Sequence, residues 1–145
     1  MASKPETTYI KGVHKYLTQS YYEKTNNPFR SGTPDVWYSG NLGELWVEYK
    51  FIERIPKNAE ILPEVSPRQA QWLANRLAEG RNVAVVVGSP EGGVIYRRAN
   101  WLIALSPAEF RKLMVPKEAV AKWIYGQVGD QTCLSLESFL PLPKS

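Results

Sequence analysis

The most constraining feature of this chain is the segment NVAVVVG, residues 82–88, in which four valines stand close together. A continuous β-branched run predicts a strand that is buried on both faces, because a half-exposed strand alternates apolar and polar residues. Such a strand needs other elements to cover both of its sides. The run therefore predicts an α/β fold in which helices pack on a sheet.

The patterns on either side supply those helices and further strands. Apolar residues recur at helical spacing near the start of the chain, and turn-rich segments separate two later strands. The predicted order is helix, strand, strand, helix, strand, strand, helix, helix, over residues 7–22, 35–38, 44–52, 67–79, 82–88, 94–98, 107–114 and 117–125. No repeat or linker divides the chain, so residues 1–145 are expected to form a single domain with a small mixed sheet flanked by helices. Residues 133–145 show no pattern that we can assign.

The helix before the valine run has the clearest boundaries. Ser66 is a natural N-cap residue, Pro67 takes the first helical position, and Gln69 completes a capping box of the form S-x-x-Q. Gly80 is typical of a helix C-terminus. This segment is predicted to be a helix that begins beside the strand carrying the polar residues described next.

The strand at residues 44–52 separates into two faces by its period of two. One face is wholly apolar and consists of Leu45, Val47, Tyr49 and Phe51. The opposite face carries Glu44, Trp46, Glu48 and Lys50. Glu48 and Lys50 are roughly 6 to 7 Å apart along such a strand, so both side chains can reach one shared point.

Asp35 is expected beside these two residues. It stands at the start of the preceding strand, and a hairpin between the two strands would bring it alongside Glu48 and Lys50. Two neighbouring carboxylates repel each other unless a cation joins them, and oxygen ligands suit Mg²⁺. Such a group suits phosphodiester hydrolysis, in which the lysine neutralises charge on the transition state or handles the proton of the nucleophile. The alternative interpretation is an ordinary solvated strand face.

The composition narrows the choice of metal and of cellular location. One cysteine and one histidine exclude an internal disulfide and a cysteine-based zinc site, so oxygen ligands and Mg²⁺ or Mn²⁺ are expected. The net charge of +4 is compatible with a nucleic-acid partner. Without a signal peptide or membrane span in the sequence, the expected location is cytoplasmic.

Three quoted segments together resemble a known superfamily. The segments SGTPDVWY, LWVEYK and EVSPRQAQWLANRLAEGRNVAVVV are similar to the PD-(D/E)xK nucleases. They share a Gly before Pro-Asp, a Glu-x-Lys strand, a Ser-Pro-x-Gln helix and a Gly before a valine-rich strand. The likeness covers residues 30–88 and is greatest to VRR-NUC-type and Holliday junction resolvase-like enzymes, including those of phages. It implies a restriction-endonuclease-like core, and it suggests a phage origin, with the host cytoplasm as the location.

The resemblance also implies roles for individual residues. Asp35 and Glu48 would be metal ligands together with the backbone carbonyl of Tyr49, and Lys50 would be the catalytic lysine. Gln69 would lie near the site, although its capping box explains it equally well. Many members place a glutamate on the first helix. Glu6 matches that spacing best, and Glu23 is the alternative. Glu6 can also be explained as a negative charge that the helix N-terminus stabilises.

Several other residues are candidates for secondary roles. The DNA backbone must pass close to the metal, so Arg30, Arg54 and Lys57, which flank the site in sequence, are candidate phosphate contacts, or else ordinary surface charges. His14 is expected at the surface or its boundary rather than in catalysis. Trp46 is expected to pack beneath the first helix, with base stacking as the alternative.

The expected function is a Mg²⁺-dependent endonuclease that acts on branched, junction or flap DNA. A chain of 145 residues leaves little room for a separate sequence-reading domain, which favours recognition of DNA shape. Junction cleavage requires two symmetric cuts, so a homodimer is expected in that case. The alternatives are an RNA-processing nuclease, and a non-catalytic nucleic-acid-binding or protein-interaction module on the same fold.

Overall fold

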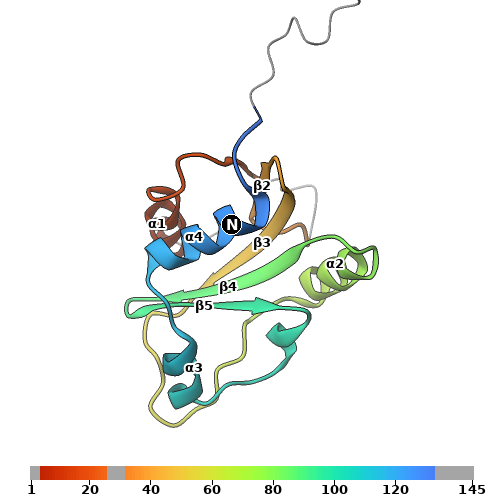
Figure 1. Ribbon diagram of the computed structural model, residues 1–145. Helices are drawn as coiled ribbons and strands as arrows, with labels where there is room; N and C mark the ends of the chain where they lie inside the picture. Colours follow the sequence, from red (N-terminus) through yellow and green to blue (C-terminus); the bar gives the residue numbers. More distant parts are fainter. Residues whose placement is uncertain (1–3, 26–31, 133–145) are drawn as a thin grey trace, which may run out of the picture.

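The computed structural model describes residues 4–25 and 32–132, which form a sheet with helices on both faces (Figure 1). The strands are β1 (Tyr21–Lys24), β2 (Val36–Gly40), β3 (Gly43–Phe51), β4 (Val83–Ser89) and β5 (Gly92–Arg97). The helices are α1 (Lys4–His14), α2 (Pro67–Ala78), α3 (Pro107–Leu113) and α4 (Lys117–Val128), with a 3-10 turn, η1 (Asn100–Leu102). The predicted α/β fold with a mixed sheet is confirmed.

The sheet has five strands in the order β1-β2-β3-β4-β5. Among the strands of the described residues, only the pair β3–β4 is parallel, and α2 makes the crossover between these two strands. All seven residues of β4 are buried, as its run of valines predicts. The parallel pair at the centre is therefore covered on both faces, and the antiparallel pairs extend the sheet outward.

Two hydrophobic cores lie on opposite faces of the sheet. Helices α1 and α4 cover one face, where the apolar side chains Leu45, Val47 and Tyr49 of β3 are buried against them. The other face packs against α2, η1 and α3, with Leu73, Trp101 and Phe110 at its centre. Trp46 lies on this second face and contacts Trp72 of α2 at 5.2 Å between ring centroids, so it packs beneath α2 and not beneath the first helix. No helix in residues 4–25 and 32–132 is both long and apolar enough to cross a bilayer.

The first helix is shorter than its sequence predicts. It ends at His14, and residues 21–24 form the edge strand β1, which pairs with β2. The prediction of a helix that extends to residue 22 is therefore wrong. A turn after His14, closed by bonds from the amides of Tyr16 and Leu17, keeps Leu17 in the core. All four residues of β1 are exposed, so their apolar pattern carries no strand signal.

Candidate active site

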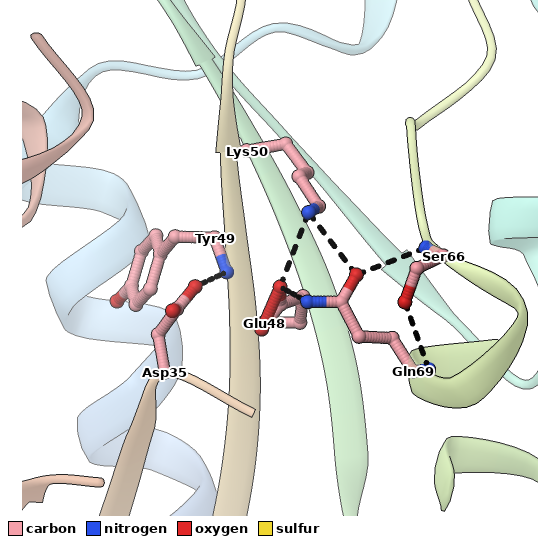
Figure 2. A network of polar contacts seen from close by, with 6 residues as sticks. All are labelled: Asp35, Glu48, Tyr49, Lys50, Ser66 and Gln69. Carbon is pink, nitrogen blue, oxygen red and sulfur yellow. Dashed lines mark hydrogen bonds and ion pairs between the residues drawn. The ribbon is translucent and has the colours of Figure 1, made fainter. Parts of the chain in front are cut away.

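The register of β2 and β3 brings Asp35 alongside Glu48. Val36 pairs with Val47, so the residue before Val36 comes opposite the residue after Val47. Oδ2 of Asp35 accepts a hydrogen bond of 2.8 Å from the backbone amide of Tyr49, which fixes the carboxylate against β3 (Figure 2). The short turn between the two strands therefore sets the position of both carboxylates.

Glu48 is an acid in a buried position. Its side chain is only 2% exposed, and Oε2 accepts a hydrogen bond of 2.6 Å from Nε2 of Gln69. Oε1 of Glu48 is buried and has no hydrogen-bond donor within the described residues. The Asp35 carboxyl can form a hydrogen bond to Glu48 only when one of the two carboxyl groups holds a proton. Burial and the charge of Asp35 raise the pKa of Glu48 to about 8, although Lys50 opposes the shift.

Lys50 lies between Glu48 and Gln69. Its Nζ is 3.3 Å from Oε2 of Glu48 and donates a 3.1 Å hydrogen bond to Oε1 of Gln69. The side chain is 22% exposed, so part of it remains accessible to solvent. A bound anion could reach this lysine without displacing it from its two partners.

Gln69 serves both roles that its sequence position allows. Its side-chain Oε1 accepts a hydrogen bond from the backbone amide of Ser66. The backbone amide of Gln69 donates in turn to Oγ of Ser66, which completes the capping box of α2. The same side chain bonds to Glu48 and Lys50 (Figure 2). The cap therefore holds the amide in the one orientation that offers a donor to the carboxylate and an acceptor to the ammonium group.

Of the two glutamates considered for the first helix, Glu6 lies near this group. It is in the first turn of α1, and burial and the charge of Asp35 raise its pKa to about 7, with Lys50 opposing. Glu6 and Lys50 line one cavity of about 370 Å³. Glu23 is instead on the exposed strand β1 and accepts a hydrogen bond from the Tyr21 hydroxyl. The structure thus places Glu6, and not Glu23, next to Asp35 and Lys50.

The candidate DNA contacts are less well defined. Arg30 lies outside the residues that the structure describes. Arg54 and Lys57 are exposed on the connection between β3 and α2, and neither lines the cavity beside Lys50. Their contact with phosphate stays a prediction.

The donors present suit a hard divalent cation. Among residues 4–25 and 32–132 no three His, Cys, Asp or Glu side chains are grouped closely enough to hold a metal by themselves. Asp35 and Glu48 would therefore need the backbone carbonyl of Tyr49 and water to complete a coordination shell, which is how Mg²⁺ is commonly bound. The buried Oε1 of Glu48, which has no donor among the described residues, fits this interpretation because a cation would satisfy it.

A buried polar chain supports the strand from the other face of the sheet. Nε2 of His14 bonds to the hydroxyl of Tyr38 over 2.7 Å, and that hydroxyl bonds to the hydroxyl of Tyr49. The expectation that His14 lies at the surface or its boundary is wrong, because the residue is buried at 9% exposure and burial lowers its pKa to about 4. Sequence reasoning could not find this chain, since Tyr38 is 24 residues away from His14.

Comparison with known proteins gives a structural match and no sequence match. The sequence matches no protein-family model and no curated protein. The structure is similar to Hjc, a Holliday junction resolvase from the archaeal hyperthermophile Archaeoglobus fulgidus, with a TM-score of 0.53 and 13% sequence identity. The match covers 84% of this chain and 99% of the resolvase. The chain therefore has the α/β, restriction-endonuclease-like fold of that resolvase.

Proposed function

We propose that this protein is a Mg²⁺-dependent endonuclease that hydrolyses phosphodiester bonds in branched DNA, such as junctions or flaps. The observation that carries the proposal is the buried Glu48, whose Oε1 has no donor among the described residues, beside Asp35 and Lys50. Without a cation, only Lys50 and a proton held by the pair offset the repulsion between Asp35 and Glu48, and Oε1 of Glu48 stays without a donor among the described residues. The resolvase-like fold supports the nuclease interpretation and the choice of branched DNA.

In this proposal the residues have separate tasks. Asp35, Glu48 and the carbonyl of Tyr49 would hold Mg²⁺ or Mn²⁺. Glu6 lies close enough for its charge to interact with Asp35 and Lys50. The chemistry that such a cation supplies is Lewis-acid polarisation of the phosphoryl group. Lys50 would neutralise the negative charge that develops on phosphorus, or hold the proton of the attacking water. Gln69 would fix the positions of Glu48 and Lys50.

The test is cleavage of labelled four-way junction, flap, single-stranded and linear duplex DNA in Mg²⁺ or Mn²⁺. We expect the wild-type protein to prefer branched DNA, and we expect Lys50→Ala and Asp35→Ala to lower the rate by at least about 100-fold. Glu23→Gln is the matched control, because it removes a strand carboxylate outside the group. The proposal is wrong if no DNA is cut, or if Lys50→Ala cuts as fast as the wild type.

The same assay separates the alternative functions. RNA strands of the same sequences would be cut preferentially by an RNA-processing enzyme. DNA binding that weakens steeply with salt and leads to no cleavage would indicate a binding module. A junction resolvase would also need two symmetric active sites, so light scattering during size-exclusion chromatography should give the mass of a dimer.

A further inference from the structure

A second cavity, of about 350 Å³, lies next to the candidate active site. It is formed by the first turn of α1, the start of α4 and the turn between β4 and β5, and its walls include Lys4, Pro5, Tyr9, Phe51, Pro90 and Lys117. Phe51 also lines the cavity beside Lys50, and Pro5 precedes Glu6 of that cavity. The two cavities are therefore neighbours that share one wall.

Two ammonium groups dominate the charge of the second cavity. Neither Lys4 nor Lys117 forms an ion pair within residues 4–25 and 32–132, and no carboxylate is among the lining residues. Nζ of Lys117 lies 5.4 Å from the centroid of the Tyr9 ring, and the ammonium group and the end of its stem pack against Gly12. Lys117 is thus held in place by an aromatic face and by α1, and its charge is not neutralised.

The hydroxyl groups of Thr8 and Ser89 in this cavity are already engaged, whereas the buried Tyr9 hydroxyl has no partner among the described residues. The Thr8 hydroxyl donates to the carbonyl of Lys4, and the Ser89 hydroxyl donates to the carbonyl of Gly92. The rest of the wall is apolar, since Pro5, Tyr9, Phe51 and Pro90 provide most of it. A suitable ligand therefore has an anionic group for the lysines and an apolar ring for the wall.

The neighbouring cavity has the opposite charge. Its lining includes Glu6, Glu60 and Glu64, and Lys50 is the only cation that the described part of the chain contributes to it. A second phosphate of a bound strand would be repelled there in the absence of metal, whereas the cavity of Lys4 and Lys117 would attract it. The charges of the two cavities therefore give a bound nucleic-acid strand a direction, away from Lys50 and across Phe51.

We propose that the cavity of Lys4 and Lys117 binds a nucleotide of the substrate strand close to the scissile phosphate. Its phosphate pairs with the two ammonium groups, and its deoxyribose or base rests on Phe51 and the two prolines, while the buried Tyr9 ring holds Lys117. This assignment rests on the proposed nuclease function, because it takes the cavity of Lys50 as the place of cleavage. It adds a subsite that fixes the register of the strand.

The experiment measures binding of a fluorescein-labelled four-way junction and its single strands in EDTA, by anisotropy between 50 and 200 mM salt. We expect Lys4→Gln with Lys117→Gln to raise Kd about tenfold and to reduce the slope of log K against log salt by about 1 per lysine. Lys112→Gln with Lys122→Gln is the matched control, since both residues are exposed elsewhere and the same charge is lost. Lys117→Arg keeps the positive charge, so this variant should bind like the wild type and not like the double variant.

A second measurement locates the phosphate. Single methylphosphonate groups are placed along the strand that is cut, and we expect one position near the cut to raise the KM of the wild type but not that of the double variant. Unchanged Kd and salt slope in the double variant, or equal losses in the matched control, would overturn the subsite. Cleavage is scored separately: a wild type that binds but never cuts contradicts the nuclease function, while the binding result still decides the subsite.

Discussion

Nε2 of Gln69 donates a 2.6 Å hydrogen bond to Oε2 of Glu48, which joins the first turn of α2 to the buried acid of β3. The amide oxygen of the same residue accepts from both Ser66 and Lys50. One side chain thus stabilises the helix start and positions the two charged groups. The two roles can be separated because Ser66 takes part only in the cap.

Gln69→Ala should damage the site and the helix together. We expect cleavage or metal affinity to fall by about 10- to 100-fold, because Glu48 and Lys50 lose their shared partner. We expect Ser66→Ala to cost about 1 kcal/mol of stability through the lost cap and to leave cleavage within about twofold. The measurements are urea unfolding and the junction cleavage rate. Equal loss of activity in both variants would mean that Gln69 acts through the cap alone.

The metal-free protein should lose stability as pH rises from about 4.5 to about 8. The pKa of Glu48 is raised from 4.5 to about 8 in the folded state, so the folded protein binds more protons than the unfolded chain between these values. The free energy of unfolding therefore falls as pH rises through this window and levels off above about 8. Urea unfolding in EDTA, with Glu48→Gln as the comparison, should show a smaller slope in the variant.

The best window for that measurement is pH 7 to 9. Glu6, with its pKa raised to about 7, adds to the same slope mainly at lower pH. The lowered pKa of His14, about 4, has the opposite effect, because stability is lost as pH falls from about 6.5 towards 4. Above pH 7 the contribution of His14 is complete, whereas that of Glu6 fades towards pH 8 and is present in both proteins, so it cancels in the comparison. Parallel slopes for the wild type and Glu48→Gln in this window would contradict a raised pKa at Glu48.

Much of the fold could be predicted from the sequence because its signals are local. The valine run of β4, the capping box of α2 and the alternation along β3 all lie within short windows. The position of Asp35 followed from the short turn between its strand and β3. Where a pattern is repeated over a few residues and its partner is the next element, sequence is sufficient.

The remaining features depend on contacts between distant residues. β1 is exposed along its whole length and exists through pairing with β2, so nothing in residues 21–24 marks it as a strand. The burial of His14 depends on Tyr38, and the place of Trp46 depends on Trp72. The contact between Gln69 and Glu48 spans 21 residues and is set by how α2 lies against β3. Local periodicity carries no information on such packing.

Tyr38→Phe should destabilise the protein although it removes a single oxygen atom. The Tyr38 hydroxyl lies between Nε2 of His14 and the hydroxyl of Tyr49, and both partners would be left buried without it. We expect the free energy of unfolding to fall by about 1–3 kcal/mol, as for other unsatisfied buried groups. Tyr22→Phe is the control, because Tyr22 is exposed on β1. A loss no larger than that of the control in urea unfolding would show that the chain adds nothing to stability.

Divalent cations should stabilise the folded protein independently of any cleavage. A ligand that binds only the folded state adds about 2.7 kcal/mol at 100 times its dissociation constant, which is a measurable rise in Tm. We expect this rise with Mg²⁺ or Mn²⁺ in the wild type and in Lys50→Ala, and its loss in Asp35→Asn and Glu48→Gln. Because Glu48 must be ionised to bind a cation, the rise should be larger at pH 8.5 than at pH 6.5. Differential scanning fluorimetry over a metal titration is the measurement, with Glu23→Gln as the matched control. An equal rise in Glu48→Gln and in the wild type would place the cation elsewhere and would remove the basis for assigning the chemistry to Asp35 and Glu48.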